Sequence, residues 1–300
     1  MGWTTILWFI LSHSLSPIEL IKGKVAESSY EAYDRQWRRL LSWLQDRGLP
    51  PRLSSLSVPL LLELFDDMFA AGFCYATPNL TRSAIALQCC LGLLPAPFIT
   101  THPAIIAALK GYKRRAAGRS VRREPIGRAR YAKLLSLAKQ LIPQALWAQV
   151  EAAFALGYEA LFRIQETLSV LVADVSFTPE GVLIFLAQSK TDQFRKGIYI
   201  RVRERRLCTL LRQLCANRQP HQKLFSISAH LLNAVIKQAA AYWSWLGYFS
   251  YHSLRHGKAT DIWLATASLE AVMKAGRWSS KASARWYVHV LDCPDLDDLA

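Results

Sequence analysis

The sequence predicts a mainly α-helical protein of two domains with one small antiparallel β-sheet, an α+β fold. Apolar residues recur at helical spacing over most of the 300 residues, and one segment rich in β-branched and aromatic residues interrupts them. A strongly basic run lies between two helical regions. With 52% hydrophobic and 20% charged residues the composition is that of a globular protein, and the length allows two ordinary domains.

Residues 1–112 are predicted to form a small all-helical domain. In its first helix, residues 30–46, the apolar side chains recur at helical spacing, namely Tyr33, Trp37, Leu40, Leu41 and Leu44. Three more helices are expected at residues 57–72, with Ser57 as the N-terminal cap, at 79–93 and at 104–111. The proline-rich stretch LLPAPFITTHP separates the last two.

The apolar start of the chain, MGWTTILWFILSHS, has the composition of a signal peptide without its charge pattern. No Lys or Arg precedes Lys22, and the unbroken apolar run from Ile6 to Leu11 is far shorter than the roughly 20 residues of a membrane span. We therefore expect neither secretion nor a membrane segment. We interpret residues 1–25 as a packing helix or a poorly ordered lead.

The chain is strongly basic: Lys and Arg outnumber Asp and Glu by 37 to 22, the formal net charge is +15 and the pI is near 9.8. Such an excess indicates a polyanionic partner, either nucleic acid or an acidic membrane surface. Residues 113–128 are predicted to be a basic linker, which can lie along a DNA backbone, stay solvated or serve as a nuclear address. Its candidate DNA contacts are Lys113, Arg114, Arg115, Arg119, Arg122 and Arg123.

Residues 129–300 are predicted to form the second domain, mostly helical with one β-hairpin. The hairpin is expected within residues 181–202, where the polar loop SKTDQFRKG separates two runs rich in Ile, Val, Leu and Tyr. The helix before it is expected to end near Asp174. The other helices are predicted at residues 130–142, 145–157, 205–216, 228–246, 252–265, 268–275 with Gly276 as its C-terminal stop, and 279–288.

Six cysteines occur without a C-x-x-C pair, and no histidine cluster has the spacing of zinc ligands. We interpret the cysteines as buried free thiols in a reducing compartment, and we expect no metal. They are Cys74, Cys89, Cys90, Cys208, Cys215 and Cys293.

A series of residues suited to phosphate chemistry runs through the second domain. It comprises Arg163 with Glu166, Lys190 at the hairpin tip, His252, Arg255 and His256 in HSLRHG, Trp278 in GRWSS and Tyr287 in ARWYVH. His252 and Arg255 are three residues apart on a predicted helix, so they share one face. Each residue alone has an ordinary explanation, such as a surface ion pair for Arg163 and Glu166. The order of the whole series is what indicates a site.

The order Arg, Lys, His-x-x-Arg, Trp, Tyr resembles that of the tyrosine recombinases, also called lambda-type integrases, and the resemblance covers nearly the whole chain. QSKTDQFRKG and GRWSS are similar to segments in recombinases of mobile elements of the DIRS and Ngaro kind. The resemblance implies two domains that clamp double-stranded DNA, with residues 1–112 as the helical core-binding domain and residues 129–300 as the catalytic domain. It also implies a site-specific recombinase that integrates, excises or resolves a mobile element through a covalent 3′-phosphotyrosyl intermediate, as a tetramer on paired sites and without a metal or another cofactor.

The resemblance gives each catalytic candidate a role that suits its chemistry. Arg163 and Arg255 would clamp the scissile phosphate, because guanidinium groups bind it in a fork and stay charged. Tyr287 would be the nucleophile, and His252 would act as a base or a phosphate donor. Lys190 would protonate the departing 5′-hydroxyl.

Two further residues have supporting roles in this interpretation. Trp278 occupies a position where members of the family carry His or Trp, and its indole would donate to a phosphate oxygen or buttress the helix of Tyr287. Glu166 is expected to orient Arg163 or His256.

Three alternatives stay open on the sequence. A catalytically inactive DNA-binding remnant would keep the fold and the charge, and a type IB topoisomerase would share most of the catalytic set but relax supercoils as a monomer. A basic membrane-surface protein is less favoured, because no basic amphipathic helix with a clean polar face is evident. For a recombinase the expected location is the nucleoid-associated cytoplasm of a prokaryote or a virus-infected cell, or the nucleus of a eukaryote.

Overall fold

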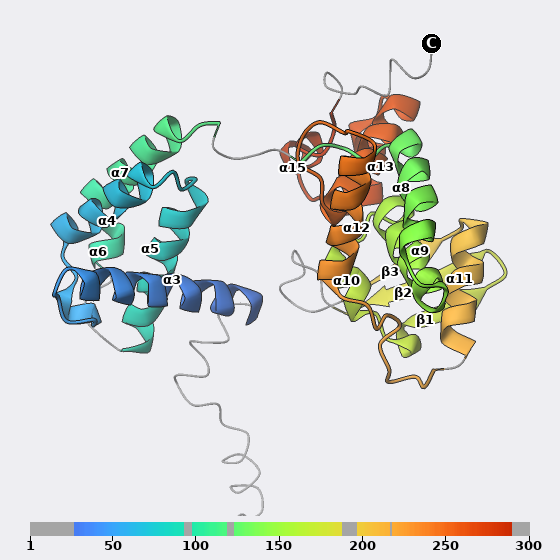
Figure 1. The fold of residues 1–300 in the computed structure, drawn as a ribbon, viewed down its shortest axis with the longest axis horizontal. Helices are drawn as coiled ribbons and strands as arrows, with labels where there is room; N and C mark the ends of the chain where they lie inside the picture. The colour runs from blue at the N-terminus through green and yellow to red at the C-terminus, as the bar shows by residue number, and fades with distance from the viewer. Residues whose placement is uncertain (1–26, 93–97, 119–122, 188–196, 217, 290–300) are drawn as a thin grey trace, which may run out of the picture. The chain divides into compact units, whose positions relative to one another are not determined.

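The structure, a computed structural model, describes residues 27–92, 98–118, 123–187, 197–216 and 218–289 (Figure 1). The chain divides between residues 121 and 122 into two compact units, each with its own cluster of buried apolar side chains. Helices dominate the described residues, whose one sheet has three antiparallel strands, so the predicted α+β class is confirmed. Within the same residues no helix is long and apolar enough to cross a membrane.

The first unit is a small group of helices around one core. Its elements are α3 (Glu27–Asp46), a 3₁₀ turn (Leu53–Ser55), α4 (Val58–Ala70), α5 (Ala76–Leu91), α6 (Phe98–Thr101) and α7 (Pro103–Arg115). The core contains Leu40 and Leu44 from the predicted stripe of α3, together with Leu61, Ile85 and Ile105. Ser57 caps α4 as predicted, because its Oγ accepts a hydrogen bond from Leu60 N at 3.4 Å.

The second unit is built around α9. Its helices are α8 (Arg128–Leu141), α9 (Gln144–Glu159), α10 (Ile164–Ser169), α11 (Arg205–Ala216), α12 (Ala229–Tyr242), α13 (Tyr251–Thr266), α14 (Leu269–Gly276) and α15 (Lys281–Arg285). Every residue of α9 from Gln149 to Tyr158 is buried, because α8, α11 and α13 all pack against this helix. Since a helix buried on all sides has no polar face, α9 forms the centre of the unit.

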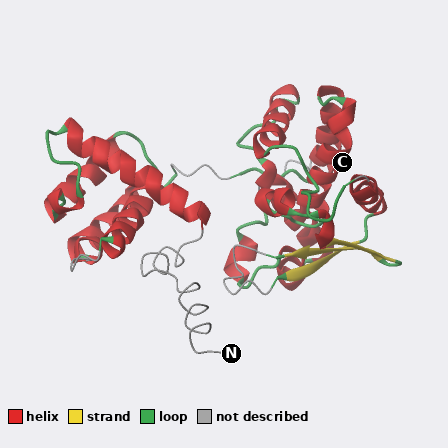
Figure 2. Ribbon diagram, turned by 90° about the horizontal axis from the view of Figure 1, so that it is seen from below, coloured by secondary structure: helices red, strands yellow, loops and turns green. Residues whose placement is uncertain are grey.

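The sheet lies at one edge of the second unit (Figure 2). Its strands β1 (Val175–Thr178), β2 (Gly181–Leu186) and β3 (Ile198–Val202) pair antiparallel in the order β1-β2-β3. Side chains of β2 alternate in burial, and Val182, Ile184 and Leu186 face the core. β2 and β3 are the strands of the predicted hairpin, whereas Lys190 in the loop between them lies outside the described residues.

The prediction that the helix before the hairpin ends near Asp174 is wrong. α10 ends at its sixth residue, and a 3₁₀ turn and strand β1 follow. The backbone of this stretch is bound to a distant loop instead of to itself: Val172 N donates to Gln222 O at 3.0 Å, and Leu224 N donates to Val170 O at 2.8 Å. These tertiary hydrogen bonds satisfy the groups that a longer helix would have paired internally.

Two other helices are shorter than predicted. The helix expected over residues 228–246 ends early as α12, because Ser244 adopts a left-handed conformation with φ of +53°. The helix expected over residues 279–288 ends as α15 before Tyr287. There the backbone tightens into turns, and Tyr287 N donates to Ala284 O at 3.0 Å.

The predicted linker is described in two parts. Residues 113–115 form the last turn of α7, and residues 119–122 lie outside the described residues. The next part of the linker is attached to the second unit, where Ile126 is fully buried and its N–H donates to Ser253 O at 2.9 Å.

The cysteines of the described residues are free thiols. Cys89 is buried and burial raises the pKa of its thiol, but Cys90 beside it is exposed. The prediction of buried thiols is therefore wrong for Cys90, which lies on the outer side of α5. Cys293 lies outside the described residues.

Gly257 marks the closest approach of α13 to this linker segment. A Cβ atom at residue 257 would lie 1.8 Å from Ile126 O and 2.7 Å from Gly127 N, which are backbone atoms. We expect Gly257→Ala to lower the free energy of unfolding by about 1–3 kcal/mol, because the backbone must move to admit the methyl group. Urea unfolding followed by circular dichroism measures the change.

Gly111→Ala is the matched control, because Gly111 is also inside a helix, α7, but a Cβ atom there meets nothing within 4 Å. This variant should raise the free energy of unfolding of its unit by about 0.5–1 kcal/mol through helix propensity. Equal effects of the two substitutions would contradict the close packing at Gly257.

Candidate active site

The predicted catalytic residues come from the ends of four helices. Arg163 is the N-cap of α10, His252 and Arg255 lie in the first turns of α13, Trp278 follows α14 and Tyr287 follows α15. The last four are in direct ring or hydrogen-bond contact with one another. Lys190 belongs to the part of the chain that is not described.

The start of α13 fixes two of these side chains. Ser250 is the extended N-cap, and its N–H donates to Ser253 Oγ at 3.1 Å in a capping box. With the first residue of the helix set in this way, His252 and Arg255 lie on one face, as their spacing predicted.

Arg255 is completely buried, with 0% of its surface exposed. Its guanidinium donates to two main-chain acceptors, Leu161 O and Gly276 O. The guanidinium carbon lies 4.5 Å from the ring centre of Trp278 and 5.4 Å from that of Tyr287, so two aromatic rings cover the cation. Among the described residues Arg255 Nε has no hydrogen-bond acceptor.

Two left-handed residues present these carbonyl groups. Leu161 has φ of +51° and Arg277, directly after Gly276, has φ of +58°. The left-handed stop of α14 is therefore Arg277, whereas the sequence analysis predicted Gly276. Gly276 has another function in packing, because a Cβ atom there would lie 1.8 Å from the ring of Trp278.

Tyr287 is held by two histidines of α13. Its hydroxyl lies 2.8 Å from His252 Nε2, and its ring stacks on His256 with ring centres 4.5 Å apart. His256 Nδ1 in turn lies 3.0 Å from His289 Nε2. His256 thus contacts Tyr287 and His289, and of the two partners expected for Glu166 it is Arg163 that the carboxylate binds.

The surroundings of His252 favour the neutral form of its imidazole. Burial, followed by the positive charges of Arg255, Arg123 and Arg163, lowers the pKa of its imidazole to about 4. At neutral pH the ring is therefore uncharged, and Nε2 in the appropriate tautomer can accept the proton of the Tyr287 hydroxyl.

Glu166 is a buried carboxylate shared by two arginines. Arg163 donates to it from Nη1 at 2.5 Å and from its backbone N at 2.9 Å, and Arg277 Nη2 donates at 2.9 Å. Burial acts to raise the pKa of Glu166, but the hydrogen bond from Arg163 N and the charges of Arg277 and Arg163 outweigh it, so the pKa is lowered. The expected orientation of Arg163 by Glu166 agrees with this geometry.

Arg277 is the site residue that the sequence interpretation missed. Its only local signal is a basic residue at the end of a predicted helix, in GRWSS. Nothing in a single sequence pairs it with Glu166, which precedes it by more than a hundred residues. The cluster also lowers the pKa of Arg255 to about 9, through burial and the charges of Arg163 and Arg277, and this arginine still stays charged at neutral pH.

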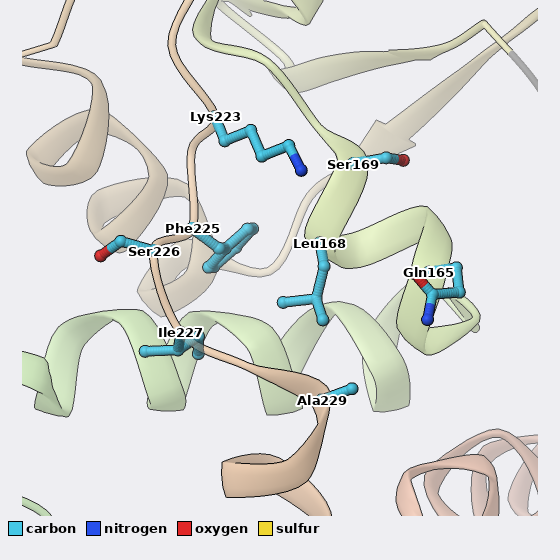
Figure 3. Close-up of a pocket in the computed structure, with 8 residues that line it drawn as sticks. All are labelled: Gln165, Leu168, Ser169, Lys223, Phe225, Ser226, Ile227 and Ala229. Carbon is cyan, nitrogen blue, oxygen red and sulfur yellow. The ribbon is translucent and has the colours of Figure 1, made fainter.

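A hollow of about 460 Å³ adjoins α10 (Figure 3). Its lining comes from α10 and from the segment before α12, namely Gln165, Leu168, Ser169, Lys223, Phe225, Ser226, Ile227 and Ala229. Lys223 is the one charged side chain among them, and in Figure 3 it points toward Ser169. Lys223 thus gives an otherwise neutral lining its one positive charge.

The DNA-binding candidates of the linker are divided between the two units and the residues that are not described. Lys113, Arg114 and Arg115 are at the end of α7, and Arg119 and Arg122 lie outside the described residues. Arg123 donates from Nε to Ser250 Oγ at 3.0 Å, which places it beside the start of α13. Across the described ranges, no group of three His, Cys, Asp or Glu side chains is arranged to hold a metal ion.

Comparison with known proteins assigns the chain to a family. The model of the phage integrase family matches residues 128–293, more than half of the chain. The chain belongs to the phage integrase family. This match confirms the expected resemblance to lambda-type integrases, and it covers the second unit with every residue of the site.

One curated relative of this integrase-family chain is an integrase/recombinase xerD homolog of Selenomonas ruminantium. It is 26% identical over 198 residues, which are 63% of this chain and 54% of the relative. The chain thus spans about half the length of the curated relative that it matches.

Solved structures of integrases share the fold. The Tn1549 transposon integrase in complex with circular intermediate DNA has a TM-score of 0.62 at 15% identity, covering 93% of this chain and 96% of the other. A lambda integrase dimer bound to a COC′ core site has a TM-score of 0.58 at 16% identity, with 95% and 93% covered. At this identity the likeness concerns the fold.

The environment of His252 leads to a pH prediction. We expect its imidazole to stay neutral until the pH falls to about 4, since burial and three arginine charges oppose protonation. Nuclear magnetic resonance of nitrogen-labelled histidine measures this titration, and His252→Asn identifies the resonance. In urea the same residue should titrate near the usual pKa of about 6.5. A native midpoint at that value would contradict the buried, electropositive environment.

Proposed function

We propose that this chain is a tyrosine-type site-specific DNA recombinase that cleaves and rejoins DNA strands through a covalent 3′-phosphotyrosyl intermediate. The observation that carries the proposal is the contact between Tyr287 Oη and His252 Nε2 at 2.8 Å, directly beside the buried Arg255. A nucleophile within reach of a neutral base, next to a fixed cation, is the arrangement that phosphoryl transfer to a side chain requires.

The proposed step transfers one DNA strand to the enzyme. Tyr287 Oη attacks the scissile phosphorus while its proton passes to His252 Nε2. The bond from phosphorus to the 5′ oxygen breaks, and the departing oxygen takes up a proton, which we assign to Lys190 from the undescribed hairpin loop. In the reverse step a 5′-hydroxyl attacks the phosphotyrosine and releases Tyr287. No bond energy is lost to water, so the strand can be rejoined to a new partner.

Arg255 and Arg163 provide the charge that this step needs. Negative charge grows on the non-bridging phosphate oxygens during the attack, and fixed guanidinium groups stabilise it without reorganisation. Arg255 Nε, without an acceptor among the described residues, is free to donate to such an oxygen. Because the rings of Trp278 and Tyr287 cover Arg255, we propose that they shift when the phosphate enters.

We propose double-stranded DNA as the partner, bound by four copies of the chain on paired sites of a mobile element. The net charge of +15 supports a polyanionic partner. The basic end of α7 and the hollow beside Lys223 offer contacts for backbone phosphates outside the reacting group. Solved structures with the same fold include a transposon integrase with circular intermediate DNA and a XerH recombinase with its difH substrate.

Loss of the Tyr287 hydroxyl should abolish the covalent intermediate. Labelled DNA that carries a nick or a 5′-phosphorothiolate near candidate element ends is incubated with the protein and run on a denaturing gel. The unaltered protein should give a shifted band, and Tyr287→Phe should give none while still binding the same DNA. The variant also loses one hydrogen bond, so its unfolding free energy should fall by about 0.5–1.5 kcal/mol.

Tyr242→Phe is the matched control, because Tyr242 lies on the same unit with 65% of its surface exposed. This variant should form the adduct normally. Salt-sensitive DNA binding without any adduct in the unaltered protein would favour an inactive DNA-binding remnant. Relaxation of a plasmid that lacks a target site would favour topoisomerase activity.

Replacement of Arg255 by lysine should distinguish the effect of its charge on the rate from the effect of its hydrogen-bond geometry. Arg255→Lys keeps the positive charge, but one ammonium nitrogen cannot replace the three separate nitrogens that serve Leu161 O, Gly276 O and a phosphate, so adduct formation should slow by about 10²–10³-fold. Single-turnover kinetics on the nicked substrate measure the rate. Arg212→Lys, at an exposed arginine of α11, is the control and should leave the rate unchanged. A similar rate in both variants would contradict a catalytic function of Arg255.

A further inference from the structure

Arg277 connects the two arginines of the proposed clamp. Its side chain is largely buried and reaches across from the turn after α14 to the segment before α10. There Nη1 donates to Ala160 O at 3.0 Å, and Nη2 donates to Leu161 O at 3.1 Å and to Glu166 Oε2 at 2.9 Å. One guanidinium thus joins two main-chain carbonyls and one carboxylate.

Two of the three groups that Arg277 binds also hold a clamp arginine. Leu161 O accepts from Arg255 as well as from Arg277. Glu166 accepts from Arg163 as well as from Arg277. A displacement of Arg277 would therefore release both clamp arginines from shared acceptors at the same time.

The backbone conformation of Arg277 carries a local cost in free energy. Arg277 adopts φ of +58°, a conformation that glycine adopts without strain and other residues adopt at a cost of about 1 kcal/mol or more. Its buried ion pair with Glu166 also requires the removal of two charges from water. Strain and buried charge persist where the surrounding structure uses them, and here the adjoining groups are those of the site.

We propose that Arg277 is a positioning residue that fixes Leu161 O and the Glu166 carboxylate and thereby aims Arg255 and Arg163 at one phosphate. The inference rests on the proposed function, because it concerns the rate of the same cleavage step. Arg277 itself does not contact the DNA in this proposal, since both of its Nη atoms donate to the protein and its Nε is buried.

The charged and titratable neighbours of Glu166 come from three elements. Arg163 belongs to its own helix, Arg277 to the turn after α14, and Arg255, His252 and Tyr251 to α13. His252 and Tyr251 are neutral and the other three are cations, so the loss of one arginine leaves a buried carboxylate with fewer compensating charges.

The test uses Arg277→Gly, which removes the side chain and accommodates the left-handed backbone. We expect adduct formation on nicked DNA to slow by about 10-fold to 100-fold, with DNA affinity nearly unchanged, because misplaced catalytic groups affect the chemical step. Arg277→Lys should recover part of the rate, since it restores a positive charge beside Glu166, but its single ammonium nitrogen cannot take the place of two Nη atoms that reach separate acceptors.

Arg206→Ala is the matched control. Arg206 also binds a largely buried carboxylate in the second unit, with hydrogen bonds of 2.8 and 2.7 Å to Glu151. This pair joins α11 to α9 and is not part of the site. This variant should keep the cleavage rate and its pH profile.

The pH profile distinguishes positioning from mere structural support. Without Arg277, burial raises the pKa of Glu166, and a protonated Glu166 no longer accepts two hydrogen bonds from Arg163. In Arg277→Gly the acid limb of the cleavage rate should therefore move to higher pH. A purely structural residue would lower the rate by the same factor at every pH.

Thermal unfolding without DNA tests the same link independently of cleavage. In the unaltered protein the lowered pKa of Glu166 contributes stability above its usual value of about 4.3, and this contribution is lost as the pH falls through the folded pKa. The difference in unfolding temperature between Arg277→Gly and the unaltered protein should therefore become smaller as the pH falls below about 4.3.

The two measurements separate the possible failures. If the unaltered protein forms no adduct, the proposed function fails, while the thermal data still decide whether Arg277 controls Glu166. If the gap in unfolding temperature is independent of pH, or if Arg277→Gly cleaves with the rate and acid limb of the unaltered protein, the positioning role is overturned.

Discussion

A guanidinium group that is entirely buried, as that of Arg255 is, must be solvated by the protein itself, and the rest of the site is arranged around this requirement. Two main-chain carbonyls take the place of water, and they come from Leu161 and Gly276, which are distant in the sequence. Carbonyls can point inward at these places because Leu161 and Arg277 adopt left-handed backbone conformations. The rings of Trp278 and Tyr287 then complete the enclosure.

The same enclosure gives the site an excess of positive charge. Arg163, Arg255 and Arg277 lie around a single carboxylate, that of Glu166, and their mutual repulsion contributes to the lowered pKa of Arg255. Such an excess opposes folding, because charges of like sign are held together away from water. The interaction energy of these positive charges becomes favourable when an anion enters the site. It is most favourable when that anion gains negative charge. The arrangement is thus better matched to a reacting phosphate than to an empty site.

Local patterns predicted much of the helical framework and several described residues that the structure brings together, but not how they are held. The spacing of His252 and Arg255 was sufficient to place them on one face, since a helix fixes neighbours three residues apart. The short α10 was not predictable, because hydrogen bonds to residues near Gln222 end it. Arg277 was missed for a related reason: its partners are set by the tertiary fold, and its left-handed conformation has no signal in the sequence.

The position of Tyr287 beyond the end of α15 has a mechanical consequence. Its backbone is held by a hydrogen bond of the turn type to Ala284 O, whereas its ring and hydroxyl are held by His252, His256 and Trp278. A nucleophile inside a regular helix would have to break helical hydrogen bonds in order to move. Here the side-chain contacts determine where the hydroxyl lies, and an entering phosphate can replace them one by one. Under the proposed function, the early end of α15, which the sequence pattern did not predict, would let Tyr287 move without unfolding a helix.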